Sequence, residues 1–113
     1  MTGRRGMTAI DEMPAGRELD ALVAEKVMGW DHYPSKHEIV PAYSTDIAAA
    51  WEVVEKMRSD DWWAQIAQDN TDIWDAKLWR GEPDRWFPTM ETYGNAPTAP
   101  LAICRATLKT VNA

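Results

Sequence analysis

This chain of 113 residues contains one cysteine, one phenylalanine and no long apolar run. The single cysteine, Cys104, excludes an intramolecular disulfide and a zinc cluster built from several cysteines. No apolar stretch approaches the roughly 20 residues that a membrane-spanning helix needs, and the first residues lack the apolar stretch of a signal peptide. We therefore expect one cytoplasmic domain with no membrane partner.

Basic residues are also in short supply. The chain has 12 lysines and arginines against 18 acidic residues, which gives a formal net charge of −6. A generic nucleic-acid-binding protein needs surplus positive charge to displace the counterions of phosphates, so we expect no direct contact with nucleic acid. The same charge balance permits a protein that imitates a polyanion.

The sequence offers few groups for catalysis or metal binding. His32 and His37 lie in a proline-containing loop beside Asp31 and Glu38, but their spacing of five residues matches no firm metal-binding pattern. Cys104 falls on an apolar helical stripe, where a free cysteine usually behaves as a small buried apolar residue. The phosphate-binding patterns GxxxxGKS/T and GxGxxG are missing. We expect no enzyme, no metal and no cofactor.

What is present includes three segments with the apolar spacing of amphipathic helices. The first, residues 17–30, has Gly29 where a left-handed C-terminal cap belongs. The last begins near Thr98, a candidate N-cap, and Pro100 suits its first turn. The apolar positions of these two helices are Leu19, Leu22, Val23 and Val27, and Leu101, Cys104, Leu108 and Val111.

The most regular helical pattern lies in AYSTDIAAAWEVVEKM, residues 42–57. Ser44 or Thr45 is expected to cap the helix by accepting from its free amides. Apolar residues then recur at helical spacing, and Trp51 lies at the centre of their stripe. We therefore expect Trp51 to belong to the core rather than to a ligand site. The stripe consists of Ile47, Ala50, Trp51, Val54 and Met57.

The middle of the chain changes to the alternation that is typical of β-strands. The expected strands are residues 61–67, 71–80 and 85–93. Trp74 and Leu78 fall on one face of the second strand, and Trp79 falls on the other. If helices pack on one face, the second face remains for a partner, a ligand or another subunit.

These elements predict an α+β fold. Three helices are expected to pack on a small antiparallel sheet of about three strands. The single domain is expected to span residues 17–113. Residues 1–16 show no periodic pattern and are expected to form a flexible arm.

Three segments, LVAEKVMGW, YSTDIAAAWEVVEKM and APTAPLAICRATLK, together with the tryptophan-bearing middle, resemble the phage ABA-sandwich domain family. The resemblance covers about residues 17–111. It implies a helix–sheet–helix sandwich and a phage origin. It implies no catalytic residues, because the family offers none to carry over to this chain.

The strongest functional pattern is WDAKLWRGEPDRWF, residues 74–87. Trp79, Arg80, Arg85 and Trp86 flank a turn, and such groups can stack on a nucleobase and bind a phosphate. We include Arg105 as a further phosphate-binding candidate. In the alternative interpretation, the tryptophans close the core, and Arg80 and Arg85 pair with the acidic residues of the turn.

The sequence leaves three alternative functions open. The first is a non-enzymatic phage accessory protein, a homo-oligomer that sequesters a small anionic nucleotide-like signal; the analogy is with small phage proteins that sequester bacterial immune signals. The second is an acidic inhibitor of a host nuclease or another host defence protein. The third is a structural phage protein with no ligand.

Overall fold

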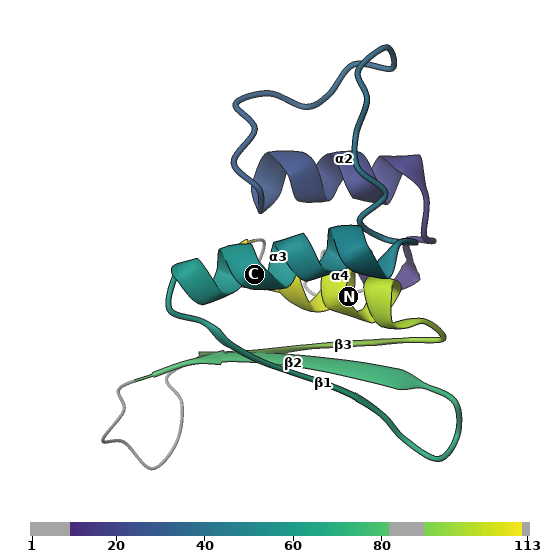
Figure 1. The fold of residues 1–113 in the computed structure, drawn as a ribbon, viewed down its shortest axis with the longest axis vertical. Helices are drawn as coiled ribbons and strands as arrows, with labels where there is room; N and C mark the ends of the chain where they lie inside the picture. Colours follow the sequence, from purple (N-terminus) through teal and green to yellow (C-terminus); the bar gives the residue numbers. More distant parts are fainter. Residues whose placement is uncertain (1–9, 82–89, 112–113) are drawn as a thin grey trace, which may run out of the picture.

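The computed structural model describes residues 10–81 and 90–111. Its elements are α2 (Arg17–Lys26), α3 (Ile47–Ser59), β1 (Trp63–Gln68), β2 (Trp74–Arg80), β3 (Met90–Ala96) and α4 (Ala99–Val111). A further short stretch, residues 10–12, is also helical. The strands form one antiparallel sheet in the order β1-β2-β3 (Figure 1). The α+β class and the three antiparallel strands are confirmed.

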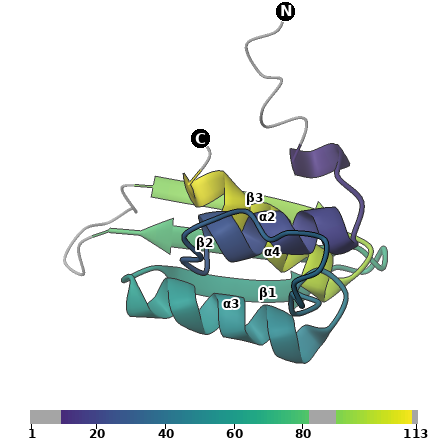
Figure 2. The same cartoon turned by 90° about the horizontal axis from the view of Figure 1, so that it is seen from above.

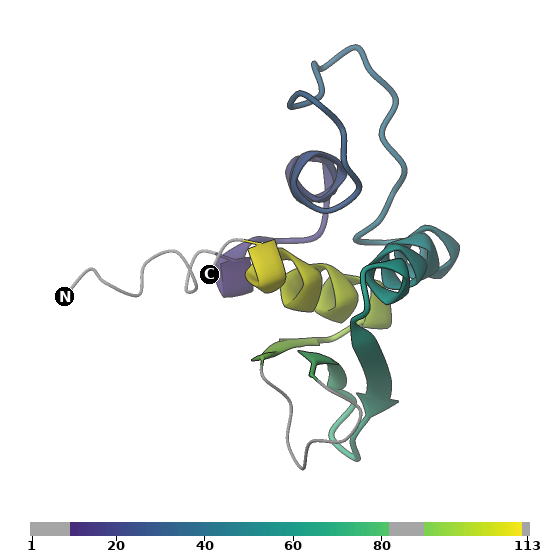
Figure 3. The same ribbon diagram turned by 90° about the vertical axis from the view of Figure 1, so that its left-hand side faces the viewer.

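The labelled helices all lie on one side of the sheet (Figures 1 and 3). α4 and α3 form the layer next to the strands, and α2 packs on α4 from the side away from the sheet. The layers therefore run helix, helix pair, sheet, an order that differs from the helix–sheet–helix order expected from the resemblance. The physical reason is that helices pack closely on the face with Ala76, Leu78 and Gly94, whereas the other face carries charged and amide side chains beside its aromatic residues.

The alternation along β2 confirms the predicted faces. Lys77 lies between Gln65 of β1 and Tyr93 of β3 in the register of the sheet. Its neighbours Ala76 and Leu78 point to the helices and are buried. Because side chains alternate along a strand, one face of the sheet belongs to the core and the other is left open.

The last helix is the centre of the core. Most of its residues are buried, and α4 contacts the sheet, α3 and α2. Gly94 in β3 permits this approach, because a Cβ atom at that position would lie 2.2 Å from the carbonyl oxygen of Ala102. β3 continues to Ala96, beyond the predicted end of the strand at residue 93. The expected strand residues 85–89 lie outside the described part of the chain.

The prediction that Trp51 belongs to the core is wrong, since 49% of its surface is exposed. Ile47 is likewise half-exposed. The buried face of α3 is turned toward α4 and consists of Ala49, Ala50, Val53, Val54 and Met57. The spacing in the sequence fits both stripes, because neighbouring stripes on a helix share most of their residues.

The expectation that Ser44 or Thr45 caps α3 is wrong. The cap is Asp46, whose side chain accepts a hydrogen bond from the backbone N–H of Ala48. Ser44 is fully buried and donates from Oγ to Asp20 Oδ1 over 2.6 Å. The same hydroxyl accepts from the backbone N–H of Gly16 over 2.9 Å. This buried network joins the beginning of α2 to the segment before α3, so the packing of the domain begins before residue 17.

Candidate functional site: the open face of the sheet

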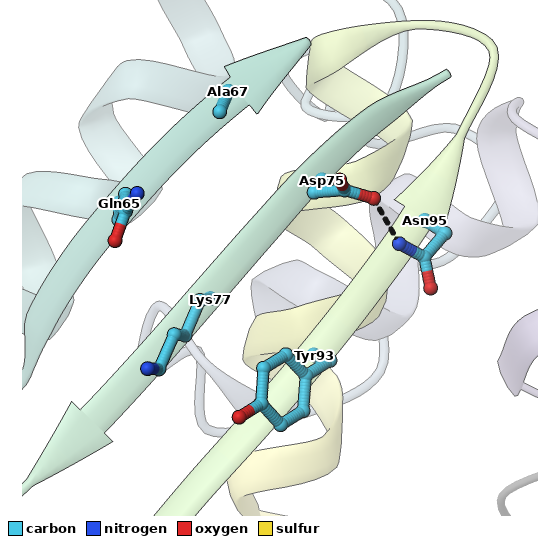
Figure 4. A pocket seen from close by; sticks show the side chains of 6 residues that line it. All are labelled: Gln65, Ala67, Asp75, Lys77, Tyr93 and Asn95. Atoms are coloured by element: carbon cyan, nitrogen blue, oxygen red, sulfur yellow. Dashed lines mark hydrogen bonds between the residues drawn. The ribbon is translucent and has the colours of Figure 1, made fainter. Parts of the chain in front are cut away.

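The sheet face that no described helix covers carries charged, amide and aromatic side chains. Six of its residues line a shallow depression of about 480 Å³ (Figure 4). They come from all three strands and are Gln65, Ala67, Asp75, Lys77, Tyr93 and Asn95. Trp63, Trp79 and Glu91 have the same strand parity and extend this face toward one end of the sheet. We call these nine residues the open face.

Lys77 stands at the centre of the open face, between two aromatic rings. Its Nζ atom lies 5.3 Å from the ring centroid of Trp79 and 5.9 Å from that of Tyr93. An ammonium group at such distances is attracted by the negative faces of the rings. Among the described residues, no carboxylate lies within ion-pair distance of Lys77. The site therefore presents a positive charge and flat aromatic surfaces together.

The acidic residues of the open face are held by neighbours. The Asn95 side-chain amide donates to Asp75 Oδ1 (Figure 4). The Tyr93 hydroxyl donates to Glu91 Oε1. This hydrogen bond raises the pKa of Tyr93, because it stabilises the protonated phenol beside a carboxylate. Both carboxylates are thus oriented along the sheet by a neighbouring donor.

One end of the open face continues onto α3. Arg58 lies over the ring of Trp63, with its Cζ atom 4.4 Å from the ring centroid. Half of the surface of Trp63 is exposed. The open face thus has a second pairing of a cation with an aromatic ring, at the edge strand β1.

The structure does not bring all the predicted site residues together. Trp79 lies on the open face as expected. Arg80 points to the opposite face, where its Cζ atom is 5.6 Å from the ring centroid of Trp62. Arg105 belongs to α4 and donates to the backbone oxygens of Asn95 and Met13 over 2.8 and 3.0 Å. The remaining two predicted residues, Arg85 and Trp86, lie outside the described part of the chain.

Lys77, Tyr93 and Asn95 line the depression, but sequence reasoning did not include them among the candidate site residues. The alternation of β2 placed Lys77 on the same face as Trp79, and this was the available signal. Tyr93 was assigned to the end of a strand that in fact runs on to Ala96. Asn95 was missed for the same reason.

The histidine loop forms a different arrangement, away from the open face. His32 Nδ1 lies 2.7 Å from Asp31 Oδ1, and Nε2 lies 2.9 Å from Glu38 Oε2. The pKa of His32 is raised by the hydrogen bonds to Asp31 and Glu38. Both imidazole nitrogens face carboxylates, an arrangement that suits a protonated ring. Within residues 10–81 and 90–111, no group of three or more candidate side chains could hold a metal ion.

Cys104 lies deep in the core. The thiol is fully buried, and this burial raises its pKa. A buried thiol with a raised pKa is a poor nucleophile, because the thiolate is the reactive form. Cys104 thus packs α4 against the rest of the core.

Within the described part of the chain, no helix combines the length and the apolar character that a membrane span requires.

Comparison with known proteins gives one informative result. The sequence model of a protein family, the phage ABA sandwich domain, matches residues 21–108. The matched segment begins in α2 and ends in α4, so it includes the whole sheet and the open face. No curated protein and no solved structure matches the chain significantly.

Proposed function

The chain belongs to the phage ABA sandwich domain family, and from this premise we propose that it is a non-enzymatic phage accessory protein that binds and sequesters a small anionic nucleotide-like ligand. The proposed binding site is the open face of the sheet, and the proposed place of action is the host cytoplasm. In this proposal Trp79 stacks on the base, as predicted from the sequence. Lys77 binds the phosphate, in place of the arginines that the sequence suggested.

The position of Lys77 between the rings of Trp79 and Tyr93 is the observation that carries the proposal. A nucleobase has a flat π-face that stacks on aromatic side chains, and each stacked base contributes about 1–3 kcal/mol. A phosphate needs a cation nearby. Lys77 supplies this cation within reach of both rings.

The amide groups of the depression suit the polar edge of such a ligand. Gln65 and Asn95 stand on opposite sides of Lys77 and Asp75, on β1 and β3 (Figure 4). Their side chains offer both donors and acceptors. A depression of about 480 Å³ falls in the usual range of small-ligand sites.

Native mass spectrometry with tryptophan fluorescence tests the proposal. The protein is incubated with host small-molecule extract and, separately, with AMP, ADP or inorganic phosphate. We expect a discrete added mass and fluorescence quenching with the extract or a nucleotide. The masses also give the number of subunits. Trp79→Ala and Lys77→Met should each weaken binding about tenfold, because a loss of about 1.4 kcal/mol, within the range for one stacked base, lowers the affinity by a factor of about ten.

Trp51→Ala is the matched control, because Trp51 is an exposed tryptophan that lies on α3 rather than on the open face. Its removal should leave nucleotide binding unchanged. A protein that gains no mass from any of these mixtures would count against ligand sequestration. Equal losses in Trp51→Ala and Trp79→Ala would move the site away from the open face.

The net charge of −6 favours a second candidate function, namely an acidic inhibitor of a host nuclease or defence protein. Complexes that rest on exposed charges weaken as salt screens them. Binding to such a host protein should therefore fall strongly between low and moderate salt. Binding that does not change with salt would contradict the charge-based mechanism.

A further inference from the structure

The sheet ends at β1 in a position that a further strand can occupy. β1 has β2 on one side and no strand on the other within the described residues. α3 runs along this outer side of β1 rather than over the middle of the sheet (Figures 2 and 3). Neighbouring helices pack about 10 Å apart, whereas neighbouring strands lie only about 4.8 Å apart. Two helices side by side are therefore wider than three strands, so α3, which lies beside α4, extends beyond β1.

The backbone groups that face this outer side can be assigned from the register. The backbone N–H of Asp69 donates to the carbonyl oxygen of Ile73 across the β1–β2 turn. In an antiparallel pair, hydrogen-bonded and non-hydrogen-bonded positions alternate, so odd-numbered residues of β1 bond to β2. Ala64 and Ile66 therefore direct their N–H and C=O groups away from the sheet.

A groove lies beside these free backbone groups. It has a volume of about 370 Å³ and is lined by Trp51, Val54, Glu55, Arg58, Ala64 and Ile66. Ala64 and Ile66 point toward the helices, yet α3 leaves both only half-buried. Trp51 and Ile47, one turn apart on α3, expose about half of their surfaces. The apolar groove and the free strand edge thus lie side by side.

The β1 strand lacks two of the features with which proteins usually block an exposed edge, namely a charged side chain and a proline. Its sequence, WAQIAQ, contains neither. The other edge of the sheet is different, because Lys109 donates to the carbonyl oxygen of Tyr93 and Arg105 to that of Asn95. Within the described chain, helix side chains therefore occupy the β3 edge, and β1 is left accessible.

We propose that β1 binds an extended segment of a partner protein as a fourth strand of the sheet. The segment would pair its backbone with Ala64 and Ile66. Its alternate apolar side chains would enter the groove and contact Trp51 and Ile66. Arg58 lies over the ring of Trp63, and within the described residues no carboxylate is in ion-pair distance. An acidic residue in the partner segment would complement it.

The geometry favours a single extended segment over a second copy of this chain. Two copies that paired through β1 would bring both α3 helices to the same side of the joined sheet, next to the shared edge (Figure 2). Two helix axes need about 8–10 Å, whereas the paired strands would lie about 4.8 Å apart.

The test begins with a displayed library of random twelve-residue peptides, selected against the full-length protein. One selected peptide is synthesised, and its effect on amide hydrogen exchange is measured by NMR. We expect peptides with alternating apolar residues that slow exchange of the Ala64 and Ile66 amides about tenfold or more. Ala64→Pro should weaken binding at least tenfold, because it removes a free N–H without breaking the β1–β2 ladder.

Two further variants keep the test decisive. Trp51→Ala should weaken peptide binding about tenfold and, as an exposed site, should not prevent folding. Tyr93→Ala, which alters the open face, should change the peptide Kd less than twofold. Failure to select any peptide, equal affinity for Ala64→Pro, or protection on another surface would overturn the proposal. Protection of Ala64 and Ile66 that grows with protein concentration alone would identify a second copy as the occupant and would also overturn it.

Discussion

The two edges of the sheet, β3 with the helix α4 and β1 with the helix α3, are built differently. We call them the β3 side and the β1 side. On the β3 side, α4 lies directly on Gly94, and the Thr92 hydroxyl donates to the carbonyl oxygen of Ala106 over 2.9 Å. Arg105 and Lys109 from the same helix donate to carbonyl oxygens of β3. On the β1 side, α3 leaves the groove and about half of the Trp51 surface open.

This difference separates stability from interaction. Regions with dense burial and many hydrogen bonds open last, whereas binding regions usually belong to the less stable part of a fold. α4 and β3 therefore provide most of the structural constraint. Substitutions on the β1 side and on the open face should lower the free energy of unfolding less than substitutions in α4 and β3. These two surfaces are therefore better suited to binding a partner or ligand.

The largest expected effect comes from filling the close contact between α4 and β3. A Cβ atom at residue 94 would lie 2.2 Å from the oxygen of Ala102 and 2.6 Å from the nitrogen of Ala106. Both neighbours are backbone atoms, so α4 would have to move. We expect Gly94→Ala to lower the free energy of unfolding by about 3 kcal/mol, measured by urea denaturation.

Asn95→Ala is the control for this substitution. Asn95 is adjacent in sequence, but its side chain points to the open face and bonds to Asp75. Its loss should cost less than about 1 kcal/mol, because the pair is exposed. If Gly94→Ala cost no more than this control, α4 would not be packed as tightly as the structure indicates.

A smaller effect is expected at Arg105. Arg105→Ala removes the hydrogen bonds to the carbonyl oxygens of Asn95 and Met13 and leaves the part-buried oxygen of Met13 without its donor. We expect a loss of about 2 kcal/mol in the free energy of unfolding. Amide exchange should also become faster around Met13, because Arg105 links that segment to β3.

The matched control is Arg58→Ala on the β1 side. Arg58 is exposed and contacts the ring of Trp63. Such a surface contact contributes less than about 1 kcal/mol. If both arginine variants lowered the free energy of unfolding equally, the hydrogen bonds that Arg105 of α4 donates would not make the β3 side more stable than the β1 side.

Much of the fold could be predicted from the sequence, because helical and strand periodicities differ clearly along this chain. The three helices and the three strands appear close to their expected positions. The exposure of Trp51 could not be predicted, since a stripe that includes it and a stripe that excludes it fit the same alanine-rich segment. The choice between them depends on how α3 rests on α4, which is a property of packing.

The candidate site was harder to predict than the fold. Trp79 was placed on the correct face because strand alternation is local information. The bonds of Arg105 were not predictable, because one acceptor, Met13, lies 92 residues away in the sequence. From the sequence alone, any arginine is a candidate anion-binding residue. Only the folded structure shows whether its N–H donors already bond to backbone carbonyl groups.

A still smaller effect on stability is expected at Trp51 itself. Although tryptophan is the largest side chain, Trp51→Ala should lower the free energy of unfolding by only about 1 kcal/mol, because half of its surface stays in water in the folded state and alanine favours the helix. Val53→Ala, two residues away and fully buried, should cost about 2 kcal/mol. Urea denaturation of the two variants compares the open and buried faces of α3 directly. A greater loss for Trp51→Ala would show that the groove is closed in solution and that the two sides of the sheet are alike.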